Sequence, residues 1–216
     1  MRFLNFNRVL CLSPHPDDVE VGMMGSIIKH PTTQFDILCL TEGGAKGFDD
    51  TNKLNRRGEV CNVWSKTDCN NIGLYNSKFD YFEDTGDAGW INYIENEFIR
   101  KYNYDCIFIP TGDDSMFEHR FVNSFGTALC RFSLISLIEY HAFSTLNTWQ
   151  PNLFVSVKRE YNTKLKALKQ FKSQSGKSYF QKPTLNSFHS NFQCSKKGLN
   201  VVEQFKVIEM FGGVDR

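Results

Sequence analysis

Three short, nearly continuous apolar runs constrain the fold of this 216-residue chain more than any other feature. They occupy residues 8–13 (RVLCLS), 35–41 (FDILCLT) and 105–110 (DCIFIP). Strands with one solvated face alternate polar and apolar side chains, whereas continuous apolar runs are typical of strands buried on both faces of a sheet. The sequence therefore predicts a largely parallel sheet with helices on both sides.

Segments with helical spacing separate these runs. Residues 19–30 have apolar positions at helical spacing and are followed by Pro31, so the first two runs predict a right-handed βαβ unit. Further helices are expected at 52–66, 90–102, 118–130 and 162–174, and further strands at 136–143 and 153–157. Residues 68–89 are not assigned, and residues 177–197 are expected to be irregular. We predict one α/β domain over residues 1–216, with a Rossmann-like, mostly parallel sheet flanked by helices.

Composition excludes several classes of function. The 25 Lys and Arg residues nearly balance the 24 Asp and Glu residues, so no nucleic-acid partner is expected. No apolar stretch near the N-terminus is long enough for a secretion signal or a membrane span. The seven Cys residues have no C-x-x-C pair, which predicts reduced thiols and a cytoplasmic location. A homo-oligomer is compatible with the sequence, but no patch fixes its stoichiometry.

The strongest chemical signal is the segment 14–20 (PHPDDVE), which places one imidazole and three carboxylates directly after a buried strand. Ligands of α/β sheets bind at this position, and His15 with Asp17 or Asp18 suits a divalent metal such as Zn²⁺. A catalytic zinc site takes three protein ligands, and His119, which follows the third apolar run, is the best candidate for the ligand still needed. The alternatives are that an aspartate caps the next helix and that His119 is a surface residue.

The other histidines and the tryptophans are less specific signals. His30 and His189 are expected to be solvated, as are the lysines of the helix at 162–174. His141 lies in an apolar run and is either a hydrogen-bonded buried histidine or part of an active-site wall. The three Trp residues are more typical of a core or rim than of a surface that stacks on sugars; they are Trp64, Trp90 and Trp149.

Residues 13–25 (SPHPDDVEVGMMG) resemble the signature of the LmbE-like, or PIG-L, family of zinc-dependent de-N-acetylases, a strand followed by (A/S)-HPDD-x-E-x-G-x-G-G. This chain has an extra proline before the histidine, and Met24 replaces a glycine. The resemblance extends to residues 40–44, 56–59, 108–120 and 164–174, and so covers most of the chain. It implies an amide-hydrolysing enzyme that acts on sugars and uses one zinc ion.

The resemblance also implies a role for each site residue. The zinc ligands would be His15, Asp18 and His119. Asp17 would be the general base that takes a proton from the zinc-bound water and later donates it to the leaving amine. Arg56 matches the arginine of the family's R-x-x-E motif, which holds a polar group of the substrate or orients a carboxylate. The alternative for Arg56 is a salt bridge to Glu59 on the same helix face.

One position departs from the family pattern. Many members have a histidine three residues before the last zinc ligand, where it helps to stabilise the oxyanion, and this chain has Met116 there. Methionine cannot donate a hydrogen bond, so we predict that His141 supplies the missing donor.

Taken as a whole, the sequence predicts a zinc hydrolase that removes an acetyl or similar short acyl group from an amino sugar. The substrate is expected to be a small molecule or a glycoconjugate. Two alternatives remain open: the same metal site acts on a non-sugar amide, or the protein is a catalytically weakened binding or scaffold protein.

Overall fold

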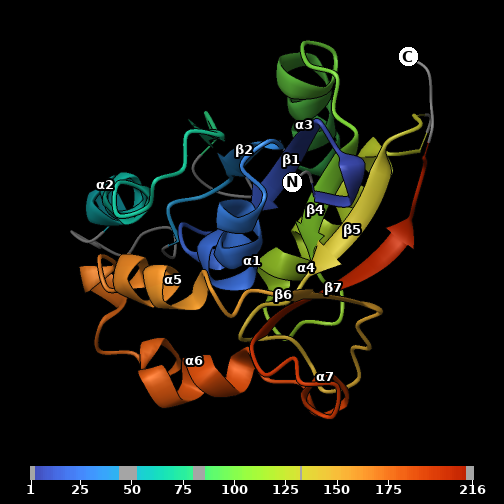
Figure 1. Ribbon diagram of the computed structural model, residues 1–216. Helices are drawn as coiled ribbons and strands as arrows, with labels where there is room; N and C mark the ends of the chain where they lie inside the picture. The colour runs from blue at the N-terminus through green and yellow to red at the C-terminus, as the bar shows by residue number, and fades with distance from the viewer. Residues whose placement is uncertain (1–2, 44–52, 80–85, 132, 213–216) are drawn as a thin grey trace.

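A seven-stranded sheet forms the centre of the computed structural model, which describes residues 3–43, 53–79, 86–131 and 133–212 (Figure 1). The strands are β1 (Arg8–Ser13), β2 (Gln34–Cys39), β3 (Ile72–Asn76), β4 (Cys106–Pro110), β5 (Ser136–Tyr140), β6 (Leu153–Ser156) and β7 (Val202–Glu209). Their order in the sheet is β3-β2-β1-β4-β5-β7-β6. Strands β1 to β5 are parallel, and β7 is antiparallel to its neighbours β5 and β6. The predicted fold class is therefore confirmed.

Helices cover both faces of the sheet. They are α1 (Asp18–Lys29), α2 (Lys53–Trp64), α3 (Gly86–Ile94), α4 (Phe117–Leu129), α5 (Tyr161–Leu168), α6 (Lys182–Phe188) and α7 (Phe192–Ser195). Because side chains alternate along β1, Val9 and Cys11 join a core cluster with α1, α2 and α5, whereas Leu10 and Leu12 join a second cluster with α3 and α4. Across the described ranges, no helix is long and apolar enough to cross a membrane.

Several elements differ from the prediction. The helix expected at 90–102 begins earlier, as α3, and continues into a π-helical turn at Glu95–Ile99. The helix expected at 162–174 ends at Leu168 and is followed by a short 3₁₀ turn, Lys172–Gln174. The segment 177–197 was expected to be irregular, but it contains α6 and α7. Strands β3 and β7 were not predicted. Residue 52, the first of the helix expected at 52–66, lies outside the described residues.

Three side chains that were expected to be solvated are buried. His30 is 6% exposed, and its Nδ1 lies 2.6 Å from a backbone carbonyl oxygen of α1. Lys164 is fully buried, and its Nζ donates to the carbonyl oxygen of Val21 and to Oε1 of Glu203, each at 2.6 Å. The same Nζ lies 2.8 Å from Nε2 of His189, which is 1% exposed. The solvated interpretation was wrong because α5 and β7 pack against α1 around Lys164 and His189. The ring of Phe3 packs edge-on against His30, with ring centroids 5.0 Å apart.

The strand order reverses between β1 and β4. From β1 the chain continues to β2 and then β3 on one side, and it returns to place β4 and β5 on the other side. At such a reversal, the loops that follow the two central strands diverge and leave a place for a ligand at their carboxyl ends.

Candidate metal and catalytic site

The three predicted metal ligands lie together at this strand-order reversal. Strand β1 ends at Ser13, and His15 follows in the turn that leads into α1, whose first residue is Asp18. Strand β4 ends at Pro110, and His119 lies in the first turn of α4. Because β1 and β4 are neighbouring parallel strands, the loops that follow them meet at one edge of the sheet.

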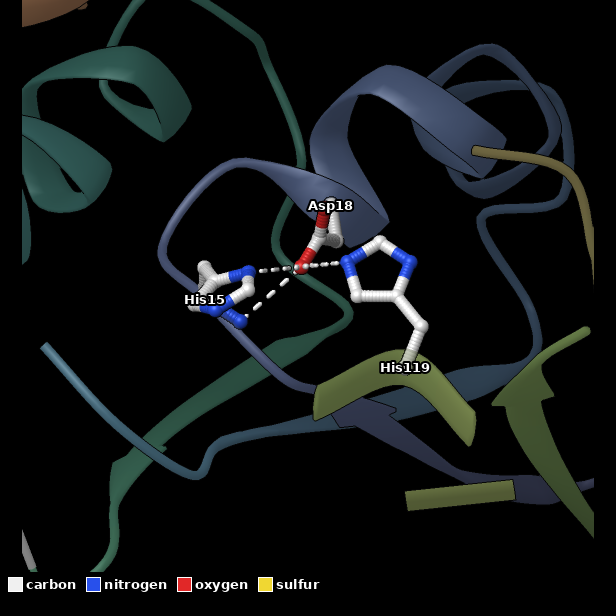
Figure 2. A group of neighbouring side chains, drawn as sticks. All are labelled: His15, Asp18 and His119. Atoms are coloured by element: carbon white, nitrogen blue, oxygen red, sulfur yellow. Dashed lines mark hydrogen bonds and ion pairs between the residues drawn. The ribbon is translucent and has the colours of Figure 1, made fainter. Parts of the chain in front are cut away.

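The carboxylate of Asp18 lies between two imidazole rings, as Figure 2 shows. Its Oδ2 is 3.2 Å from Nδ1 of His15 and 3.4 Å from Nε2 of His119. One potential ligand atom from each of the three residues lies within 4.8 Å of the others. Two imidazoles and one carboxylate form a donor set typical of catalytic zinc sites, in which water or substrate takes the remaining position.

The environment of His119 leaves one ring nitrogen available for a metal. Its Nδ1 is 3.0 Å from Oδ2 of Asp114, whose side chain is fully buried. Its Nε2 is also buried and, apart from the contact with Asp18, has no hydrogen-bond partner among the described residues. A buried polar atom without a partner is costly, and a divalent cation would satisfy this one. The residues present therefore fit a metal ion.

The carboxylates around His119 favour a positive charge at this position. Burial opposes protonation of His119, but Asp18 and Asp114 raise its pKa to about 10. Burial would raise the pKa of Asp18, but His119 and His15 hold it well below its usual range. Because a metal cation competes with the proton for the same imidazole nitrogen, a group that attracts a proton this strongly also suits a cation.

Asp17 lies beside this group in a strained backbone conformation. Its φ of 138° is one that residues other than glycine rarely adopt. It is the N-cap residue of α1, but its side chain makes no capping hydrogen bond, so the capping interpretation is wrong for this aspartate. The carboxylate of Asp18 accepts a hydrogen bond from the backbone N–H of His15 at 2.9 Å. Burial and the neighbouring charge of Asp18 raise the pKa of Asp17 to about 6, although Arg56 opposes the rise.

Arg56, in the first half of α2, contacts Asp17 rather than Glu59. Its Nη2 donates to Oδ2 of Asp17 at 3.0 Å, and its Nη1 donates to the carbonyl oxygen of Gly43 at 2.7 Å. Glu59 instead accepts hydrogen bonds from the backbone N–H and the hydroxyl of Ser173, at 2.9 and 2.6 Å. The salt bridge considered from the sequence is therefore not formed, and Arg56 fixes the position of a carboxylate.

His141 lies in the loop after β5 and is held between two aromatic rings. It stacks on Trp149 with ring centroids 5.2 Å apart and on Phe188 at 4.2 Å. Burial lowers the pKa of His141 to about 4, although Asp114 opposes the fall, so the ring is neutral at neutral pH. Met116, the N-cap residue of α4, is 39% exposed. A neutral imidazole keeps one N–H donor, whereas Met116 offers none.

Two supporting contacts were not predicted. Asp114 was not predicted to have a role, although a carboxylate five residues before a candidate ligand histidine is a usable signal. Its contact with Nδ1 of His119 leaves Nε2 to face the other ligands, as outer-shell carboxylates do in metal sites. The contact of Glu59 with Ser173 had no local signal, because 114 residues separate the two partners.

The fold and this group of residues define an α/β protein with a candidate metal site at a strand-order reversal. A profile of the PIG-L family, described as GlcNAc-PI de-N-acetylase, matches residues 10–130, more than half of the chain. The chain belongs to this family. No curated protein matches the sequence at a significant level.

Solved structures with the same fold include enzymes with different activities. An N,N'-diacetylchitobiose deacetylase from Pyrococcus horikoshii is 23% identical, with a TM-score of 0.74 over 96% of this chain and 85% of that one. The zinc-inhibited form of teicoplanin deacetylase Orf2 is 12% identical, with a TM-score of 0.69 over 92% and 96%. GalB, a 4-carboxy-2-hydroxymuconate hydratase from Pseudomonas putida KT2440, is 11% identical, with a TM-score of 0.73 over 97% and 98%. At these identities the similarity establishes the fold alone.

Proposed function

We propose that this protein is a metal-dependent de-N-acetylase that removes an acetyl or similar short acyl group from the nitrogen of an amino sugar. The proposal rests on the position of the Asp17 carboxylate. This carboxylate lies beside the three candidate metal ligands His15, Asp18 and His119. Membership of the PIG-L family and the similarity in fold to a chitobiose deacetylase support the amino-sugar substrate.

Each residue has a distinct role in the proposed reaction. The residues that would hold the metal are His15, Asp18 and His119. When bound, a divalent metal such as zinc would polarise the amide carbonyl and lower the pKa of water. Asp17, with its pKa raised to about 6, would take a proton from the attacking water and return it to the leaving amine nitrogen. Arg56 holds the Asp17 carboxylate in place, and the neutral ring of His141 would donate a hydrogen bond to the developing oxyanion.

The first experiment combines metal analysis with a substrate panel. We expect about one zinc per chain and release of free amine from at least one N-acetylated amino sugar, with simple non-sugar amides as the comparison. If zinc is present and only a non-sugar amide is hydrolysed, the proposed substrate class is wrong. If no divalent metal binds even after zinc, manganese and nickel are added, the hydrolase proposal fails and a binding or scaffold role replaces it.

Loss of Arg56 is expected to shift the pH dependence of the reaction. The guanidinium lowers the pKa of Asp17, so Arg56→Gln should raise that pKa above its value of about 6. Because a general base acts only when deprotonated, the acid limb of the kcat/KM profile should move to higher pH, and activity at pH 7 should fall. Arg57→Gln is the matched control, because Arg57 pairs with Glu42 at 2.8 Å rather than with Asp17. An unchanged acid limb in Arg56→Gln would show that Arg56 does not act through Asp17.

We also propose a cytoplasmic location. All seven cysteines are free thiols, and five of them are buried, which fits a cytoplasmic location. The substrate would be a small molecule or a glycoconjugate, with no nucleic-acid partner. A homo-oligomer is an expectation that a sedimentation experiment would test.

A further inference from the structure

Five aromatic rings form a continuous row in the C-terminal half of the chain, here called the ring row. In order of contact they are Trp149, His141, Phe188, Phe143 and Tyr179. The first three stack almost parallel, with interplanar angles of 11° and 2°, and the remaining contacts are tilted, with centroids 4.7 and 5.0 Å apart. Trp149 is buried and its Nε1 donates to Glu139 at 3.1 Å, while the other four rings are partly exposed.

Phe143 lies in the loop after β5, at the same edge of the sheet as the loop after β4 that leads to His119. Phe143 is followed by Ser144, whose hydroxyl oxygen is 3.4 Å from Nδ1 of His119. The carbonyl oxygen of Ser144 also accepts a hydrogen bond from the backbone N–H of Ser115 at 3.0 Å, so this loop is fastened to the loop that leads into α4. Phe143 is therefore one residue from a side chain that touches a metal-ligand candidate.

Tyr179, at the other end of the ring row, is linked through hydrogen bonds to α2, the helix whose Arg56 contacts Asp17. The hydroxyl of Tyr179 donates to Oε1 of Gln174 at 3.5 Å, and Gln174 follows Ser173. The hydroxyl of Ser173 donates a hydrogen bond to Glu59, and Glu59 lies one helical turn after Arg56 on α2. These contacts link one end of the ring row to His119 and the other end to α2. The rings of the row do not belong to the group of candidate metal ligands.

This edge of the sheet thus has two chemically different parts. One part carries charged and metal-ligating side chains, and the other carries aromatic rings and a histidine that is neutral at neutral pH. The three tryptophans do not supply an exposed aromatic surface, since they are 4%, 0% and 6% exposed. A substrate that matches both parts has a polar amide and, next to it, a ring with an apolar face.

We propose that Phe143 and Tyr179 form the subsite for the sugar ring of the substrate, with the C–H face of a pyranose lying against the two aromatic rings. This inference rests on the proposed function, because it assigns the amide of the same sugar to the metal site. The aromatic contacts would bind the sugar ring, whereas the bond-breaking step would depend on the charged part of the site.

The test replaces each ring by an apolar side chain without a ring. In Phe143→Leu and Tyr179→Leu, kcat/KM for N-acetylglucosamine should fall on the order of tenfold, since aromatic contacts contribute up to about 1.5 kcal/mol beyond area burial. The value for N-acetylethanolamine, an amide without a sugar ring, should stay within about twofold. Tyr179→Phe keeps the ring and should therefore lose less activity toward N-acetylglucosamine than Tyr179→Leu. Tyr93→Leu, at a partly buried tyrosine on α3, is the matched control.

A binding measurement separates this inference from the proposed function. Calorimetric titration with glucosamine should show binding to the wild type and weaker binding to both Leu variants, even if no sugar amide is hydrolysed. Absence of glucosamine binding to the wild type would overturn the subsite. So would an equal loss of activity toward both substrates, which would make the ring row purely structural. A changed preference between N-acetyl and N-butanoyl amides, with sugar binding intact, would assign the rings to the acyl chain and would also overturn the proposal.

Discussion

Replacing Asp17 with asparagine is expected to reduce turnover by about 10²–10⁴-fold and to leave the metal bound. Asparagine has nearly the same shape and tolerates positive φ better than most residues, so the strained backbone at 138° should persist. The amide cannot accept a proton from water at neutral pH. The ligand set does not include Asp17, whose carboxylate is held by Arg56 at 3.0 Å.

The matched variant is Asp18→Asn, which changes the adjacent carboxylate in the same way. Its Oδ2 lies between the two histidines, at 3.2 and 3.4 Å, so its loss should release most of the metal. Elemental analysis after dialysis and amine release under the same conditions would compare the two variants directly. If Asp17→Asn lost the metal and Asp18→Asn kept it, the assignment of base and ligand within the pair would be reversed.

The central part of the fold could be predicted from the sequence because its signals are local. The run at 8–13 corresponds to β1 residue for residue, since strands buried on both faces carry a continuous apolar pattern. Strand β3 lies at the edge of the sheet, and most of its side chains are partly or fully exposed, so it lacks that pattern. Helix α6 has a single fully buried residue, Leu185, and its polar sequence indicated irregular structure.

The candidate site shows the same division between local and long-range information. The segment with His15 and Asp18 is local and was recognised directly, whereas bringing His119 to it depends on β1 and β4 being neighbours in the sheet. The contact of Arg56 with Asp17 joins residues 39 positions apart, and sequence spacing suggested Glu59 instead. Helical spacing identifies which residues share a face, but it does not show what packs against that face.

A second large effect is expected from Lys164, the lysine that the sequence placed on a solvated face. Lys164→Met should lower the free energy of unfolding by about 3–5 kcal/mol, because it leaves the carboxylate of Glu203 buried without its cation. Glu203 also accepts hydrogen bonds from the backbone N–H groups of Gly25 and Ser26, at 2.8 and 2.6 Å, so the pair ties β7 and α5 to the helix that begins with Asp18. Urea unfolding followed by circular dichroism would measure the change.

Two further variants decide whether the effect comes from the unpaired charge. Lys166→Met removes an exposed lysine of the same helix and should change stability by less than about 0.5 kcal/mol. The double variant Lys164→Met with Glu203→Gln removes the buried charge, but Gln keeps an acceptor for the backbone of α1. It should therefore recover part of the lost stability, since replacing both members of a buried ion pair costs less than breaking it. A double variant no more stable than Lys164→Met would mean that lost packing around the lysine, rather than an uncompensated carboxylate, destabilises the protein.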